Sequence, residues 1–211
     1  MSRENILHKV RTALGRSAGQ PPSPPPPVRL RVPIVDTERR IATMTMRIEA
    51  LAGKTWRVAT ARDACALASQ FIEGKAAVAS NAPYLAECGI VNLPGVRTGI
   101  RNVEELRTLC AAADVGITSA DYALSDTGTL VMIASPAEAR LVSLLPTMHL
   151  AIVPKERILT SLDELFTLLP RPADQTSSMV LITGPSRTAD IEQILVRGVH
   201  GPGQIGVIIV G

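Results

Sequence analysis

Aromatic residues are scarce in this sequence, and their scarcity limits what the chain can bind. One Trp, two Tyr and two Phe make up 2% of the 211 residues. Proteins that hold single-stranded nucleic acid stack its bases on exposed aromatic rings, and this chain has few rings to spare. A nucleic-acid partner is therefore not expected.

Cysteine is scarce as well. Cys65, Cys88 and Cys110 are far apart, odd in number and without a C-x-x-C pair. Such cysteines encode neither a disulfide framework nor a metal or iron–sulfur cluster. We therefore expect no redox cofactor in this chain and a reducing compartment, the cytoplasm.

Long hydrophobic runs and an even charge distribution are also missing. No apolar stretch reaches 18 residues, so neither a membrane span nor a signal peptide is expected. Residues 1–40 carry eight Lys or Arg against three Asp or Glu, although the whole chain is only +3. This basic leader is either a solvated tail or a segment that meets an acidic partner or lipid surface.

The body of the chain, by contrast, is rich in apolar runs that alternate with amphipathic stretches, a pattern typical of parallel strands joined by helices. Runs such as 179–182 and 207–210 are apolar throughout, which predicts strands buried on both faces. The predicted fold class is α/β, a three-layer α/β/α sandwich around a mostly parallel sheet. The expected strands are 55–59, 76–79, 115–118, 129–134, 149–153, 179–183 and 206–210; the expected helices are 62–73, 103–113, 137–144, 162–168 and 191–196.

Two regions are expected from the N-terminal pattern, a leader at 1–28 and one α/β domain at 29–211. Apolar residues at helical spacing predict a helix over 3–14, and the following Pro21–Pro27 tract predicts a stiff polyproline II linker. A second amphipathic helix is expected at 37–51. The linker leaves the first helix to fold back, to dock on a partner, or to swap onto a neighbouring subunit in a homo-oligomer.

Three short motifs resemble known sites but stand in the wrong context. Gly201–Gly206 spells G-x-G-x-x-G but precedes the last strand, whereas a dinucleotide site needs it between a strand and a helix. Gly53–Thr55 resembles a P-loop end, but Ile48 stands where the first glycine is required. Asp126–Thr129 spells the aspartic-protease motif, whose chemistry needs a second copy on an all-β frame.

The first cluster of candidate site residues lies between Thr118 and Thr129. Thr118 is placed at a predicted strand end, and Gly128 allows a turn in which Thr127 and Thr129 present amides and hydroxyls to an anion. Asp126 is the candidate acid, base or nucleophile. Asp121 joins it as a second candidate catalytic carboxylate. The alternative is a strand–turn–strand whose Asp and Thr side chains only cap backbone groups.

A second cluster follows Pro136. Arg140 is the leading anion-binding candidate because a guanidinium grips carboxylate or phosphate with two hydrogen bonds, and Ser143 lies on the same helical face. His149 opens a strand and His200 lies in the turn before the last strand. Either imidazole can titrate near neutral pH, although a lone His is more often a hydrogen-bonded structural residue.

The loop from Gly184 to Asp190 is the third candidate. It is expected to connect a buried strand to a helix, where Ser186 and Thr188 hydroxyls and the first helix amides would face the same ligand. Thr188 or Asp190 can instead simply cap that helix. This composition predicts a cradle for phosphate, carboxylate or nucleotide.

These motifs in order resemble the lactate utilisation protein C family, whose domain is called LUD. They are G-I-T-x-x-D, D-T-G-T, R-x-x-S-L-L-P, a strand-opening His, G-P-S-x-T-A-D-I-E and G-x-H-G-P, and the resemblance spans Thr55–Gly211. It implies a fold similar to ribose-phosphate isomerases and coenzyme A transferases. One departure is Asp126, where members often carry Glu; the shorter side chain retracts the carboxylate by one methylene.

The resemblance implies membership of a three-protein system that oxidises L-lactate to pyruvate, with iron–sulfur clusters in the partner proteins. In this first interpretation the chain binds a small carboxylate or another anion. A second interpretation is an independent isomerase or transferase acting on a sugar phosphate or acyl thioester. A third is a non-catalytic assembly module that docks through its leader.

Overall fold

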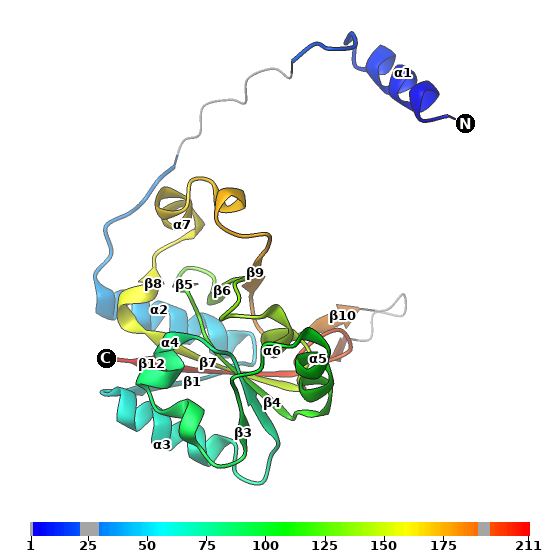
Figure 1. Cartoon of the computed structure of the whole chain (residues 1–211). Coiled ribbons are helices and arrows are strands. Elements are labelled where there is room, and N and C mark those ends of the chain that lie inside the picture. Colours follow the sequence, from blue (N-terminus) through cyan, green and yellow to red (C-terminus); the bar gives the residue numbers. More distant parts are fainter. Residues whose placement is uncertain (1, 22–29, 190–194) are drawn as a thin grey trace.

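The computed structural model describes residues 2–21, 30–189 and 195–211, and a six-stranded sheet forms the centre of the body (Figure 1). Every neighbouring pair in this sheet is parallel. In spatial order the strands are β1 (Lys54–Val58), β12 (Gln204–Val210), β7 (Met148–Pro154), β4 (Val115–Ser119), β2 (Ala77–Ala79) and β3 (Val96–Arg97). The predicted parallel sheet is thereby confirmed, and β3 is an addition to it.

The central strands are buried on both faces. Every residue of β4 is buried, as are all residues of β7 and β12 after the first. Apolar side chains on both faces of these strands are removed from water when the sheet is covered, and this burial stabilises the strands. The prediction of a doubly buried strand at 207–210 is confirmed.

Helices cover the two faces of the sheet, which makes the three-layer sandwich that the sequence predicted. On one face α3 (Ala61–Phe71), α4 (Pro83–Glu87) and η1 (Ile90–Asn92) pack against apolar side chains of the sheet. On the other face lie α2 (Thr37–Ala50), α5 (Val103–Ala112) and α6 (Arg140–Leu144). Figure 1 shows α2 and α3 on opposite sides of the sheet.

Two helix N-caps and one glycine explain local details of this packing. The Thr60 hydroxyl and the Asp63 carboxylate cap the start of α3 reciprocally, and Asp36 caps α2. Gly116 in β4 lets α6 lie directly on the strand, since a Cβ atom there would fall 1.8 Å from the Val142 carbonyl oxygen. The position of α6 therefore depends on Gly116.

A second, smaller sheet lies beside the α2 face, and here the sequence-based expectation was wrong. The alternation of strands and helices predicts that the runs 129–134 and 179–183 join the mostly parallel sheet. In the structure they instead form an antiparallel pair in a separate four-stranded sheet. Its order is β8 (Ile158–Leu159), β5 (Tyr122–Leu124), β6 (Thr129–Ile133) and β9 (Met179–Ile182). As an edge strand, β9 leaves Leu181 exposed and is not buried on both faces.

Two helix predictions also need correction. The last two residues of the helix expected at 191–196 belong instead to strand β11 (Leu195–Arg197). This strand pairs antiparallel with β10 (Arg187–Ala189). The helix expected from 137 begins only at Arg140, because Ser135 and Glu138 close a turn through their backbones and the Ser135 hydroxyl. Short polar-apolar segments carry too little periodicity to separate a hairpin from a helix.

The remaining elements are α7 (Leu162–Leu168), η2 (Lys155–Arg157), η3 (Pro172–Asp174) and the leader helix α1 (Arg3–Ala13). The predicted leader helix is confirmed; Ser2 caps it, and it contains no buried residue. Residues 22–29 of the expected polyproline linker lie outside the residues that the structure describes. In the parts that it does describe, no helix has the length and apolarity to cross a membrane.

Candidate functional site

Polar side chains gather where β2 and β4 end, at the carboxyl edge of the parallel sheet. Ser80 and Asn81 follow β2 directly, and Asp121 comes two residues after β4. Parallel strands joined by helices leave a crevice at this edge, which is where open α/β folds bind ligands. Two neighbouring pockets, called the larger and the smaller lobe below, open here, and Ser135 and Ala137 line both.

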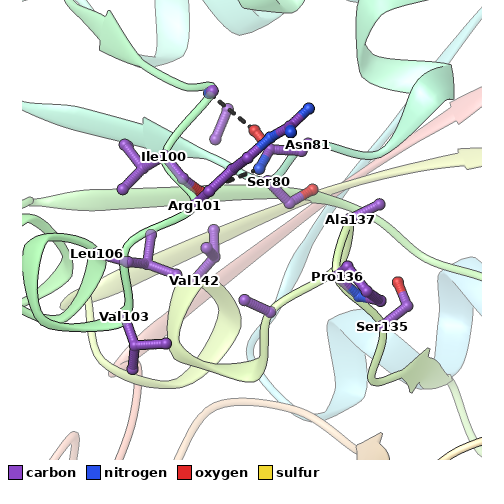
Figure 2. A pocket seen from close by; sticks show the side chains of 13 residues that line it. Ser80, Asn81, Ile100, Arg101, Val103, Leu106, Ser135, Pro136, Ala137 and Val142 are labelled. Atoms are coloured by element: carbon purple, nitrogen blue, oxygen red, sulfur yellow. Dashed lines mark hydrogen bonds between the residues drawn. The ribbon is translucent and has the colours of Figure 1, made fainter.

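The larger lobe has a volume of about 790 Å³. Its walls come from the end of β2, the loop 99–101 with the start of α5, and the segment from Ser135 to α6. Figure 2 shows Ile100, Val103 and Leu106 on one side of it and Ser135, Pro136 and Ala137 on the other. The lobe is open to solvent and mostly apolar.

Asn81 holds the two walls of this lobe together. Its side-chain oxygen accepts a hydrogen bond from the Gly99 amide at 2.8 Å, and its side-chain nitrogen donates to the Ile100 carbonyl at 3.1 Å. Its own backbone amide donates to the Ala137 carbonyl at 2.8 Å. Asn81 therefore fixes the loop before α5 relative to the loop before α6, and the cavity is shaped without a ligand.

The smaller lobe, about 150 Å³, contains most of the ionisable groups of the site. Glu138, Asp121 and Arg157 line it together with Tyr84 and Ser119. Drug-sized ligands occupy roughly 300–1,000 Å³. This lobe therefore suits a molecule of only a few non-hydrogen atoms.

Glu138 is the most unusual group in the smaller lobe. Only 5% of the residue is exposed; its Oε2 accepts a hydrogen bond from the Ser80 hydroxyl at 2.7 Å, while Oε1 has no partner among the described residues. Burial raises the pKa of Glu138 to about 8, assisted by the nearby Asp121 charge and opposed by the hydrogen bond from Ser80. The Ser119 backbone amide also lowers the pKa, and at neutral pH Glu138 is still mostly a neutral acid.

Asp121 and Arg157 place a carboxyl group and a cation in the same lobe. Asp121 Oδ2 accepts a hydrogen bond from the Ile133 amide at 2.7 Å; burial raises the pKa of Asp121, while that bond and Arg157 oppose the rise. Arg157 Nη1 donates to the Ser119 hydroxyl and the Ala120 carbonyl, both at 3.2 Å, and its guanidinium lies 5.5 Å from the Tyr84 ring centre. These contacts hold the Arg157 guanidinium in place at the smaller lobe.

The predicted Asp126–Thr129 turn exists but lines neither lobe. It connects β5 to β6, and Gly128 has a φ of 69°, as a left-handed turn residue requires. The Thr127 hydroxyl lies 2.8 Å from that of Thr129, which lies 2.7 Å from that of Thr183. Asp126 is exposed. The hydroxyls thus bind one another at this turn.

Thr118 and His149 meet each other in the core. The Thr118 hydroxyl lies 2.8 Å from His149 Nε2, and both residues are fully buried. Burial lowers the pKa of His149 to about 4, so that the imidazole is neutral. Their neighbours are core side chains such as Met132, so the pair lies away from the cavity that the two lobes form.

Arg140 and Ser143 lie on α6, next to the cavity wall but directed elsewhere. Arg140 Nη1 donates a hydrogen bond at 3.2 Å to the hydroxyl of Ser178, the residue just before β9. The Ser143 hydroxyl donates to the Arg140 carbonyl within the helix. Neither residue lines the larger or the smaller lobe.

The Gly184–His200 region lies at the opposite, amino edge of the parallel sheet. The Ser186 amide donates to the Pro202 carbonyl, and the Gly203 amide donates to the Thr147 carbonyl before β7. Gly184 has a φ of 81° beside Leu51, Thr188 lies in β10, and His200 is exposed. Asp190 lies outside the described residues. The loop leads into strand β10, and residues 191–194, where the helix of the predicted cradle was expected to begin, lie outside the described residues.

Of the residues singled out in the sequence, Asp121 therefore lines the cavity, and the sequence analysis missed its neighbours Glu138, Arg157, Ser80 and Asn81. Two signals point to them. Glu138 is the charged residue in the small-residue segment Ser135–Ala139, and Ser80-Asn81 interrupts the apolar run that forms β2. Polar residues directly after a parallel strand are the expected lining of an α/β site.

Metal ligation has no obvious place in this arrangement. Within the ranges that the structure describes, no three His, Cys, Asp or Glu side chains are grouped in a way that could hold a metal ion. Cys65 is half-buried and Cys88 and Cys110 are buried, and burial raises the pKa of all three thiols. The acid, base and anion-binding groups around Glu138 are the chemical equipment of this site.

Comparison with known proteins agrees with the resemblance seen in the motifs. The family model described as the LUD domain matches residues 41–210. Proteins named lactate utilization protein C from Exiguobacterium sp. and Halalkalibacterium halodurans are each 40% identical over 111 residues, covering 51% of this chain and 48% of theirs. The one from Bacillus subtilis is 41% identical over 102 residues, covering 46% and 42%.

These matches span about half the length of the relatives. A crystal structure of a DUF162 family protein from Deinococcus radiodurans superimposes with a TM-score of 0.63 at 20% identity, covering 84% of this chain and 100% of that one. This structural similarity supports the fold, and the LUD match identifies the family.

Proposed function

The chain belongs to the LUD domain family, and from this premise we propose that it serves in lactate utilisation by binding a small 2-hydroxy carboxylate at the Glu138 lobe. Relatives matched over about half of their length carry the name lactate utilization protein C, which supports this substrate class. The site is at the carboxyl edge of the parallel sheet, where α/β proteins bind small molecules.

Three of the ionisable groups that line the smaller lobe, Arg157, Glu138 and Asp121, fit the parts of such a ligand; Glu87 and Tyr84 line it as well. Arg157 would bind the carboxylate, since its Nη1 contacts to Ser119 and Ala120 leave other N–H groups without a partner among the described residues. The neutral Glu138 would donate a hydrogen bond from Oε1 to the 2-hydroxyl oxygen. Asp121, beside it, would accept the hydroxyl proton.

Oxidation of L-lactate to pyruvate removes two electrons and two protons from the substrate. In the proposed scheme the C2=O bond forms as two bonds break: Asp121 takes the proton of the O–H bond, and the C2–H bond breaks with its electron pair and proton passing to the redox groups of the iron–sulfur partner proteins. This chain contributes substrate binding and proton transfer in the cytoplasm, and the partners contribute the redox groups. The observation that carries the proposal is the buried Glu138 oxygen left without a partner beside a fixed cation.

A pair of carboxyl variants tests this assignment. Asp121→Asn keeps the shape but cannot accept the hydroxyl proton, so a host that lacks its own lactate utilisation protein C and carries this variant should grow on L-lactate at a rate at least about 100-fold lower. Asp126→Asn at the exposed β5–β6 turn should complement fully, as should Glu104→Gln on α5. Calorimetric titration of the purified proteins with L-lactate should give the same order.

The opposite result would move the site. If Asp126→Asn abolished complementation while Asp121→Asn retained it, the chemistry would belong to the β5–β6 turn and the proposal would be wrong. Circular dichroism and thermal melting of each variant keep a folding defect from being read as loss of function.

A second candidate function, a stand-alone isomerase or transferase, draws on the same acid and base pair. Neutral Glu138 beside Asp121 could move protons on a sugar phosphate or acyl thioester without partners. Turnover of such compounds by the isolated chain would favour it. A purely structural role predicts instead that deletion of residues 1–28 breaks a complex with the iron–sulfur partners while Asp121→Asn does not affect growth.

A further inference from the structure

The larger lobe is too large for the ligand of the smaller one. Lactate has six non-hydrogen atoms, whereas the lobe of about 790 Å³ falls in the size range of sites for drug-sized molecules, roughly 300–1,000 Å³. A small carboxylate bound at Glu138 would leave this space open. The function proposed above therefore does not account for the lobe.

The walls of the larger lobe are aliphatic and partly uncovered. Ile100, Leu106 and Val142 line it, and Val103 at its rim is 67% exposed. An apolar body placed between the start of α5 and α6 would remove these side chains from water. Pockets of this kind recognise a ligand through apolar contact and use a few polar groups for orientation.

Arg101 supplies one charged group at this lobe. Its side chain is exposed, and it makes no hydrogen bond or ion pair with any residue in the described part of the chain. Glu104 and Glu105 follow in the first turn of α5, but neither comes within ion-pair distance of it. A guanidinium in such a position suits the bidentate binding of phosphate, sulfonate or carboxylate.

We propose that the larger lobe binds a bulky organic anion, an apolar or planar body of ten or more non-hydrogen atoms with one anionic group that Arg101 contacts. The loop carrying Ile100 and Arg101 is held by Asn81, so the lobe is formed before the ligand arrives. The shared wall at Ser135 and Ala137 puts this ligand next to the Glu138 lobe.

Two fluorescent probes with the same body test the proposal on the full chain. 1-Anilinonaphthalene-8-sulfonate carries an anionic group, and N-phenyl-1-naphthylamine is its neutral counterpart. The sulfonate should bind at one site per chain, and Arg101→Gln should weaken it at least tenfold without changing the affinity for the neutral probe. Arg107→Gln, an exposed arginine farther along α5, is the matched control and should change neither.

Apolar contact and lobe identity need their own variants. Val103→Ser should weaken both probes, and Glu138→Gln should leave both unchanged, because Glu138 does not line the larger lobe. Displacement of the sulfonate by hexyl phosphate or by hexanesulfonate would identify the preferred anion, whereas L-lactate should not displace it. Circular dichroism of each variant confirms that the probe reports on the folded protein.

Several outcomes would overturn the inference. These are no stoichiometric binding of the sulfonate, equal losses in Arg101→Gln and Arg107→Gln, an effect of Glu138→Gln as large as that of Arg101→Gln, or displacement by neither hexyl anion. Loss of iron–sulfur partner binding in Arg101→Gln with unchanged probe affinity would mark the lobe as a protein-docking surface instead. None of these outcomes affects the lactate titration that tests the smaller lobe.

Discussion

Glu138 and His149 are two buried ionisable residues in similar surroundings, and only one of them lies at a cavity. Each contacts a hydroxyl group, Ser80 for Glu138 and Thr118 for His149, and each keeps one polar atom without a partner among the described residues. Burial makes both neutral at pH 7, by raising one pKa to about 8 and lowering the other to about 4. Burial and a shifted pKa therefore do not identify a site.

Access makes the difference between the two residues. Glu138 lines the smaller lobe beside Arg157, whereas His149 lies in the middle of the sheet between β4 and β12. A polar atom without a partner near a cavity can bind a ligand or water, but the same atom in the core only costs free energy. The comparison teaches that a perturbed group becomes a functional candidate when solutes can reach it.

The largest effect on stability is expected at Glu138 in alkaline solution. The folded pKa of about 8 lies above the unfolded value near 4.5, so the folded state binds the extra proton and its stability falls as pH rises between these values. Glu138→Gln removes this dependence. The difference in free energy of unfolding between variant and wild type should therefore shift with pH. Between pH 4.5 and pH 9 it should change by about 3–5 kcal/mol in favour of the variant.

Urea unfolding of both proteins across this pH range measures the effect. Parallel curves for variant and wild type would show that Glu138 is not a buried neutral acid.

The next effect is expected at His149 in acid and has the opposite pH dependence. The folded pKa of about 4 lies below the unfolded value near 6.5, so the unfolded state binds the proton first and stability is lost as pH falls from 6.5 to 4. This loss should amount to about 3 kcal/mol in the wild type. In His149→Gln the loss of stability between pH 6.5 and pH 4 should be smaller by that amount, while growth on lactate is retained. An unchanged loss of stability would contradict the description of His149 as a neutral core residue.

The smallest effects are expected from the two hydroxyl partners. Thr118→Val leaves His149 Nε2 without a partner in the dry core and should cost about 1–3 kcal/mol. Ser80→Ala should cost less than about 1 kcal/mol, because water in the adjoining cavity can replace the hydroxyl, and it should raise the pKa of Glu138 further. Equal costs for the two variants in urea unfolding would remove the distinction drawn between core and cavity.

The sequence predicted the body of the fold well because periodicity and apolar runs are local. The strands at β4, β7 and β12 and the helix at 162–168 followed from such runs. The hairpin of β10 and β11 and the antiparallel pair of β6 and β9 did not, since strand pairing depends on segments far apart in the chain. The six motifs also predicted the LUD family, which the match over residues 41–210 confirms.

The site was predicted less well for the same reason. Asp121 is one of the polar residues after β4 that the sequence indicates. The Asp126–Thr129 turn and the Gly184–Asp190 loop are stronger candidates by sequence, because glycine-rich polar segments resemble ligand-binding loops. Ser80 and Glu138 are 58 residues apart in the chain and form one hydrogen bond. Nothing local in the sequence announces that contact.

Amino-acid order alone determined the layered α/β architecture, the family and the candidate residue types, because hydrophobic burial and turn chemistry act over neighbouring residues. Only the tertiary structure decided which carboxyl is buried at a cavity, which imidazole is buried in the core, and which arginine faces open space. The reason is physical: pKa, accessibility and orphaned hydrogen-bonding atoms depend on the dielectric and on groups that meet only after β2, β4, α5 and α6 have packed.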